Sequence, residues 1–213
     1  MSKILFPLQA KYIESFRNEK DPLILEMEEY AKKHNVPILS YDSADFMEQL
    51  IKMYTPKRVL EIGTAIAYSS IRIAKNLKKK GILHTIEKSE ENAEKAKEFI
   101  SKSDQGNKIK IMLGDAFNIL PQLDKKYDFI FLDADKEDYK RLFDYCLVLL
   151  KKGGVIFVDN LLWHGYAAVK KVPANYKTST NFIREFNKIF TSHPGLKTSI
   201  LPIGDGIGLG VKI

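Results

Sequence analysis

The sequence predicts an α/β protein built on one mostly parallel, seven-stranded sheet. From about residue 57 onward, short apolar runs rich in β-branched residues alternate with amphipathic helical segments, a pattern typical of βαβ units. Near the end, two apolar runs flank Gly204-Asp205-Gly206, which predicts an antiparallel hairpin at one edge of the sheet. With 213 residues the chain suits a single domain. We expect a helical cap at residues 1–56 and a sheet core at 57–213.

Two helices are expected in the cap. The stretch DPLILEMEEYAKKHN places Asp21 as N-cap and Pro22 at the first helical position, followed by apolar residues near helical spacing. Asn35-Val36-Pro37 should end this helix, because the residue before a proline disfavours helical geometry. A second helix is expected from about Asp42, ending before Pro56.

The core should contain five strands separated by helices, followed by the hairpin. The expected parallel strands are RVLEIG (58–63), GILHTIE (81–87), KIKIMLGD (108–115), YDFIFLD (127–133) and GGVIFVD (153–159). LKTSILPI and IGLGVKI supply the two hairpin strands. Residues 161–180 form a long connection with aromatics, lysines and a proline, which is typical of a lid or binding loop.

Composition restricts the function only weakly. The net charge of +7, from 34 Lys and Arg against 27 Asp and Glu, favours an anionic partner. A solvated Lys/Glu-rich surface of the kind common in heat-adapted proteins explains the charge equally well. No apolar run is long enough to span a membrane, and the N-terminus lacks a convincing signal-peptide core, so we expect a cytoplasmic protein. The single cysteine, Cys146, is expected to be a small buried hydrophobe.

Candidate cofactor residues stand at the ends of the first three strands. In open α/β sheets ligands bind beyond the carboxyl ends of the strands. LEIGTAIAYSS offers Gly63, then Ala65 and Ala67 where a dinucleotide site would need further glycines, so a nucleotide ligand without phosphates fits better, unless the glycine only serves the turn. Glu87 ends the second strand, where a carboxylate would hold a ribose diol. Asp115 ends the third and would approach an adenine.

The next two strands both end in oxygen ligands. Asp133 follows the fourth strand, while Asp159 and Asn160 follow the fifth, and these strand ends should be neighbours. Two carboxylates and an amide oxygen suit Mg²⁺ or Ca²⁺ and are poor for Zn²⁺. Lys136 stands beside this set, which predicts a catalytic metal site rather than a plain binding surface.

At this point a resemblance becomes apparent. The motifs VLEIGTAIAYSSIRIA, IEKSEENAEKA, FIFLDADKEDY, VIFVDNLLWHG and LPIGDGIGLG together resemble the cation-dependent class I O-methyltransferases. That family includes catechol and caffeoyl-CoA O-methyltransferases and bacterial tRNA 5-hydroxyuridine methyltransferases. The resemblance extends from about residue 36 to the end. It implies a Rossmann-like sheet with strand order 3-2-1-4-5-7-6, and a homodimer.

The resemblance also implies roles for individual residues. Lys136 would be the catalytic residue. Asp135 stands where catechol methyltransferases have a tryptophan, which weakens the case for a small catechol as substrate. The residues implied to bind S-adenosylmethionine are Ile38, Gly63, Ser69, Glu87, Asp115 and Asp133. The residues implied to hold Mg²⁺ or another divalent cation are Asp133, Asp159 and Asn160.

The chemistry expected at such a site is methyl transfer to a hydroxyl. A phenol-like hydroxyl with a pKa of about 10 is a poor nucleophile at neutral pH. A divalent cation would lower that pKa and orient the oxygen. Lys136, which the cation would favour in its neutral form, would accept the proton.

The sequence favours 5-hydroxyuridine in the anticodon region of tRNA as substrate, to be converted to 5-methoxyuridine. The positive charge suits a phosphate backbone. The connection mixes lysines with aromatics that suit a splayed base. These residues are Lys170, Lys171, Lys177, Trp163, Tyr166 and Tyr176.

Two alternatives remain open from the sequence. The first is a small-molecule O-methyltransferase acting on catechols or caffeoyl-CoA-like phenols, since coenzyme A is also anionic. The second is a non-catalytic nucleotide- or RNA-binding module, which would have no need of the metal set. Trp163, His164 and Tyr166 either contact a planar substrate or pin the connection in place.

Overall fold

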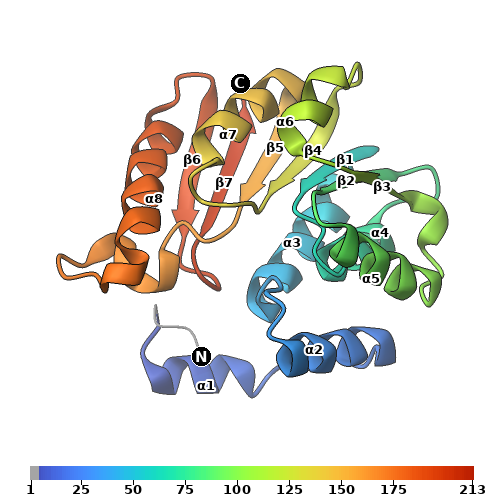
Figure 1. The fold of residues 1–213 in the computed structure, drawn as a ribbon, viewed down its shortest axis with the longest axis horizontal. Coiled ribbons are helices and arrows are strands. Elements are labelled where there is room, and N and C mark those ends of the chain that lie inside the picture. Colours follow the sequence, from blue (N-terminus) through green and yellow to red (C-terminus); the bar gives the residue numbers. More distant parts are fainter. Residues whose placement is uncertain (1–4) are drawn as a thin grey trace.

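The computed structural model describes residues 5–213 and contains a seven-stranded sheet in the order β3-β2-β1-β4-β5-β7-β6 (Figure 1). Strands β1 to β5 pair in parallel, whereas β7 is antiparallel to both β5 and β6. The predicted strand order and the C-terminal hairpin are therefore confirmed. The strands are β1 Arg58–Ile62, β2 Ile82–Glu87, β3 Ile109–Leu113, β4 Tyr127–Leu132, β5 Leu150–Val158, β6 Leu196–Leu201 and β7 Ile207–Lys212.

Alternating side chains of the strands face two separate hydrophobic cores. In β4, for example, Phe129 and Phe131 pack with α2 to α5, whereas Ile130 and Leu132 pack with α7 and α8. This alternation is the two-residue period of a strand buried on both faces. The α-helices are α1 Pro7–Glu14, α2 Pro22–His34, α3 Tyr41–Tyr54, α4 Tyr68–Asn76, α5 Glu90–Ser101, α6 Ala116–Ile119, α7 Tyr139–Leu149 and α8 Ala174–Ser192. Short 3₁₀ turns lie at Gly106–Lys108 (η1), Leu120–Gln122 (η2) and Trp163–Ala168 (η3).

The two helices predicted in the N-terminal part, α2 and α3, begin and end within a residue or so of where the sequence places them. The Asp21 side chain accepts a hydrogen bond from the Leu23 N–H, and the left-handed conformation of Asn35, with φ of 54°, ends α2. Ser40 caps α3 in the same way by accepting from the Ser43 N–H. Helix α1 was not predicted; Leu8 and Tyr12 stand one turn apart in it, but both are exposed and the helix buries no residue.

The connection predicted at residues 161–180 is shorter than expected. Its first part contains η3, and α8 already begins at Ala174. The first turns of α8 bury no residue, so the sequence shows no helical spacing there. The buried residues at helical spacing begin only at residue 180, and they are Thr180, Ile183, Phe186 and Phe190. In residues 5–213, no helix is both long and apolar enough to cross a membrane.

Candidate active site

Gly63 ends β1 at a point where the chain passes very close to the end of β4. Its φ of +104° lies in the region that side chains rarely adopt, and a β-carbon there would lie 1.9 Å from the Asp133 carbonyl oxygen. Parallel pairing continues through this point, since the Gly63 N–H donates to Ile86 O and the Asp133 N–H donates to Ile62 O. Only glycine allows the first and fourth strand ends to approach this closely.

Glu87, at the end of β2, organises the turn that follows Gly63. Its side chain is buried, and its two carboxylate oxygens accept the N–H groups of Ala65, at 2.8 Å, and Ser89, at 2.9 Å. Each oxygen keeps a further lone pair for a ligand hydroxyl. The carboxylate that the sequence predicts for ribose binding therefore also shapes the loop between β1 and α4.

The sequence interpretation missed Glu61, a fully buried acid in the middle of β1. Its two oxygens accept hydrogen bonds from the hydroxyls of Ser69 and Ser70 at the start of α4. Burial raises the pKa of the Glu61 carboxyl to about 7, and the two serine hydrogen bonds oppose this rise. An acid inside the apolar run RVLEIG was the available signal. The hydroxyl of Ser69, predicted to bind the cofactor, is engaged by Glu61 in this structure.

The structure gives two other predicted cofactor residues no contact with Gly63 or Glu87 among the described residues. Ile38 lies in the loop between α2 and α3, partly buried against the core that those helices share. Asp115 is exposed and caps α6, where one of its oxygens accepts the Phe117 N–H at 2.7 Å. Asp115 therefore has a structural role, with its other oxygen facing no described partner among residues 5–213.

Lys136 lies at the centre of the predicted metal set. Its ammonium is 2.7 Å from Asn160 Oδ1 and 3.1 Å from Asp133 Oδ1. It also donates to the Ala134 carbonyl and to the Tyr139 hydroxyl, at 2.9 and 2.8 Å. The side chain is only 11% exposed. The positive charge of Lys136 thus occupies the position where the oxygens from β4 and β5 converge.

Asp159 adds the feature that points most directly to a cation. Its side chain is buried, and its Oδ1 atom has no hydrogen-bond partner among the described residues. Burial, and then the negative charge of Asp133, raise the pKa of the Asp159 carboxyl well above its usual range. A buried, unpartnered carboxylate oxygen is costly unless a cation approaches it. Within residues 5–213 no group of three or more His, Cys, Asp or Glu side chains is placed to hold a metal, so a cation here would depend on the Asn160 amide oxygen.

The residues present fit a hard divalent cation. Asp133, Asp159 and Asn160 all supply oxygen atoms, the ligand type that Mg²⁺ and Ca²⁺ prefer. The orphaned oxygen of Asp159 and the convergence on Lys136 both indicate a place for positive charge.

An aromatic cluster borders Lys136 on the side of η3. The Lys136 ammonium lies 5.5 Å from the centroid of the Trp163 ring. Trp163 and His164 have ring centroids 5.0 Å apart, and Tyr166 and Tyr176 have the same separation. The three lysines of this connection, Lys170, Lys171 and Lys177, are exposed.

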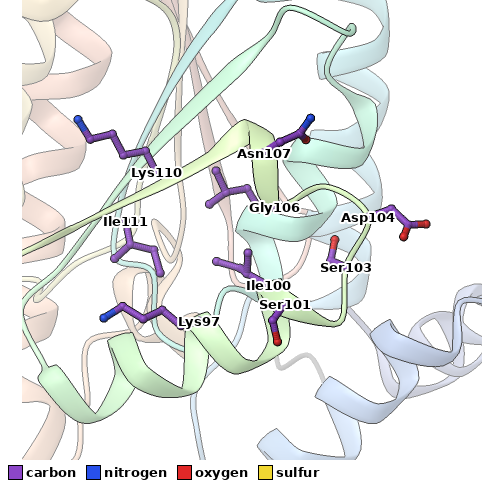
Figure 2. A pocket seen from close by; sticks show the side chains of 10 residues that line it. Lys97, Ile100, Ser101, Ser103, Asp104, Gly106, Asn107, Lys110 and Ile111 are labelled. Carbon is purple, nitrogen blue, oxygen red and sulfur yellow. The ribbon is translucent and has the colours of Figure 1, made fainter.

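The cavity drawn in Figure 2 is separate from these groups. It has a volume of ≈ 640 Å³, and none of the predicted site residues lines it. It lies between the C-terminal part of α5 and the first half of β3, near Asp104, Asn107 and Lys110. The strand-end cluster around Lys136 remains the candidate active site.

The comparisons with known proteins identify the family of the chain. A family model described as O-methyltransferase matches residues 14–213. "Caffeoyl-CoA O-methyltransferase 2" of Petunia hybrida is 34% identical over 212 residues, which cover 93% of this chain and 86% of that protein. A crystal structure of a candidate caffeoyl-CoA O-methyltransferase from Staphylococcus aureus matches with a TM-score of 0.89 and 32% identity, covering 97% of this chain and all of that one. An O-methyltransferase from Bacillus cereus, solved in complex with SAH, matches with a TM-score of 0.84 and 26% identity over 95% of this chain and 96% of that one.

Proposed function

Since the chain belongs to the O-methyltransferase family, we propose that it methylates one of two vicinal oxygens on a small phenol, with caffeoyl-CoA-like esters as the first candidates. The coarser activity is established by the family and its relatives: the protein is an S-adenosylmethionine-dependent O-methyltransferase. The tRNA substrate favoured by the sequence is the second candidate, because the caffeoyl-CoA relatives support the small-molecule alternative better.

One observation carries the proposed chemistry. Lys136 contacts both Asp133 and Asn160, beside the unpartnered Asp159 oxygen, and Gly63 brings the predicted cofactor strand against Asp133. A proton acceptor, a candidate cation site and a cofactor turn therefore meet at one edge of the sheet. Such a combination suits transfer of a methyl group to a hydroxyl.

In this mechanism the residues bind, orient and deprotonate. Glu87 and the turn after Gly63 hold S-adenosylmethionine, with the ribose on the carboxylate. When bound by Asp133, Asp159 and Asn160, a divalent cation would lower the pKa of a phenol hydroxyl and help to orient it. The Lys136 amine accepts the hydroxyl proton, the oxygen–methyl bond forms and the sulfur–methyl bond breaks. The products are a methyl ether and S-adenosylhomocysteine.

The aromatic cluster beside Lys136 favours a planar substrate. Trp163 lies beside the Lys136 ammonium, and Tyr166 of η3 lies close to Tyr176 in the first turn of α8. A phenol ring and a splayed uracil base would both fit such a wall, since both are planar. The exposed lysines of the connection favour an anionic extension, which both coenzyme A and tRNA provide.

Parallel activity assays with each candidate substrate distinguish the two proposals. Purified protein with S-adenosylmethionine and Mg²⁺ is incubated in parallel with caffeoyl-CoA, with free catechol and with an anticodon stem-loop carrying 5-hydroxyuridine. We expect methylation of the small phenols, detected by mass spectrometry. Product on the stem-loop alone would transfer the assignment to tRNA. No product on any of the three, with the cofactor bound, would refute the proposed pair of substrates.

A further inference from the structure

We propose that Asp205, in the turn between β6 and β7, is a positioning residue that orients the Asn160 amide and holds the loop after β5. The inference rests on the proposed function in one respect, namely that the Asn160 oxygen is a cation ligand. Asp205 belongs to the Gly204-Asp205-Gly206 turn between the two hairpin strands, and neither the turn signal nor the family resemblance gives it a role in the site.

The Asp205 carboxylate accepts hydrogen bonds from two residues of the loop after β5, Asn160 and His164. Its Oδ2 atom lies 3.3 Å from Asn160 Nδ2, which donates to it. Its Oδ1 atom accepts the backbone N–H of His164 at 2.5 Å. The side chain is 19% exposed, so these hydrogen bonds are partly shielded from water. One carboxylate thus links the candidate cation ligand to the first residues of η3.

These contacts select one of the two orientations of the Asn160 amide. With Oδ1 toward Lys136 and Nδ2 toward Asp205, each end of the amide meets a group of opposite hydrogen-bonding character. A flipped amide would place an NH₂ group against the Lys136 ammonium and an oxygen against the Asp205 carboxylate. Asp205 therefore keeps the amide oxygen directed at the place where Asp133 and Lys136 converge.

The turn is shaped to bring Asp205 this close. The Leu161 and Leu162 N–H groups donate to the carbonyl oxygens of Gly206 and Asp205, at 2.8 and 2.9 Å. A β-carbon at Gly206, whose φ is +92°, would lie 2.6 Å from the Leu162 nitrogen. On the other side, a β-carbon at Gly204 would lie 2.1 Å from the Ser43 hydroxyl oxygen. Glycines on both sides of Asp205 thus let the turn fit between α3 and the loop after β5.

The loop that Asp205 holds has an unfavourable backbone. Asn160, Trp163 and His164 have φ values of 63°, 46° and 56°, in the left-handed region that non-glycine residues adopt infrequently. Such conformations persist only where neighbouring groups hold them. Asp205 bonds to two of these three residues, and Trp163 lies between them along the chain.

The test measures cation binding directly, on the full chain without substrate. Mg²⁺ and Mn²⁺ affinities are determined by calorimetry for wild type, Asp205→Ala and Asp205→Asn. We expect Asp205→Ala to weaken cation binding on the order of 10–100-fold, the usual effect of removing a group that orients a ligand. S-adenosylmethionine affinity should stay within about twofold, because Asp205 contacts none of the groups at the ends of β1 and β2. Asp205→Asn keeps an acceptor for one of the two contacts and should give an intermediate loss.

Asn187→Ala is the matched control. Asn187 donates from its side chain to the Leu161 carbonyl at 2.8 Å, so it holds the same loop without contacting the Asn160 amide. This variant should bind Mg²⁺ nearly as well as wild type. An equal loss in Asn187→Ala and Asp205→Ala would show that Asp205 only anchors the loop, and wild-type affinity in Asp205→Ala would also overturn the inference.

A second readout separates this inference from the proposed function. The side-chain amide resonances of Asn160, followed by ¹⁵N NMR in chelator, should shift in Asp205→Ala and Asp205→Asn and stay in place in Asn187→Ala. Failure of the wild-type chain to bind any divalent cation would refute the metal part of the proposed function. The amide resonances would then decide the positioning role alone, and unchanged resonances in both Asp205 variants would refute it. Should Asp205→Ala fail to fold, Asp205→Asn supplies both readouts.

Discussion

The Asp133 carbonyl oxygen lies so close to Gly63 that a β-carbon on Gly63 would be 1.9 Å from it. The contact joins the end of β1, where the cofactor turn begins, to the end of β4, which carries a candidate cation ligand. Because the obstructing atom belongs to the backbone, no side-chain rearrangement can relieve the clash. The distance between the candidate cofactor residues and the candidate cation ligands is therefore set by the sheet itself.

Gly63→Ala should accordingly destabilise the fold by roughly 3–5 kcal/mol, the range of strongly disruptive substitutions. Gly153→Ala is the matched control, since Gly153 also has a positive φ, of +75°, but a β-carbon there meets nothing within 4 Å. Gly153→Ala should lower the free energy of unfolding by only about 1–2 kcal/mol, because only its backbone conformation is unfavourable for alanine. Urea denaturation measures the free energy of unfolding of both variants. Equal decreases would show that the close approach of Gly63 to Asp133 adds nothing to the effect of the backbone conformation.

Replacing Glu87 by alanine should weaken S-adenosylmethionine binding by roughly 1.5–3 kcal/mol for each charge-assisted hydrogen bond lost. Because the buried carboxylate also accepts the N–H groups of Ala65 and Ser89, the variant should lose stability as well, and urea denaturation checks that it is still folded when the affinity is measured. Calorimetric titration measures the affinity. Glu90→Ala, which removes an exposed acid at the start of α5, is the control and should have no effect. Unchanged affinity in Glu87→Ala would exclude the ribose role.

Chelation should abolish turnover, and Mg²⁺ should restore it. Asp159→Asn should remain inactive after Mg²⁺ is added back, because the amide lacks the negative charge with which the buried carboxylate would hold the cation. The variant should still be folded in chelator, since the unpartnered Asp159 oxygen makes no hydrogen bond to lose. Asp144→Ala, an exposed acid on α7, serves as control. Full activity of wild type in EDTA would eliminate the cation from the mechanism.

Lys136→Ala should reduce kcat on the order of 10²–10⁴-fold, the usual contribution of a general base. S-adenosylmethionine affinity should change less than kcat, because Lys136 has no contact with the turn after Gly63 or with Glu87, and Asp133 is its one contact among the implied cofactor residues in the described part of the chain. Steady-state kinetics and calorimetry separate the two effects. Lys140→Ala, an exposed lysine one helical turn farther on, should behave as wild type. A change in KM alone would make Lys136 a binding residue.

Glu61 predicts a pH dependence of stability. Burial raises the pKa of its carboxyl from 4.5 to about 7, so between these values the folded protein keeps a proton that the unfolded chain releases. The stabilisation from this group is complete below pH 4.5 and is lost as the pH rises to 7, by about 3 kcal/mol in total. In Glu61→Gln this component should vanish. The difference in unfolding free energy between wild type and variant, measured by urea denaturation from pH 4.5 to 7, should therefore fall by that amount. A constant difference would show that Glu61 is ionised throughout.

Much of this site could be predicted from the sequence because its signals are local. An apolar, β-branched run that stops at Gly63, Glu87, Asp133 or Asp159 marks both a buried strand and its carboxyl end. Parallel strands then bring those ends to one edge of the sheet, as the pairing of β1 with β2 and β4 confirms. The C-terminal hairpin was also predicted from a local signal, the two apolar runs around Gly204-Asp205-Gly206, whereas the order of the strands came from the family resemblance.

Only the tertiary structure shows which polar side chains form hydrogen bonds with one another. Nothing near Ser69 in the sequence shows that its hydroxyl donates to Glu61, and nothing near Asn160 shows that Asp205 orients its amide, because these contacts depend on how separate elements pack. Helix α1 escaped prediction for a different reason: its eight residues are too few to show a clear periodic pattern, although Leu8 and Tyr12 stand one turn apart. Local patterns record which face of an element is buried, whereas the partner of a polar group is set by segments that meet only when the chain folds.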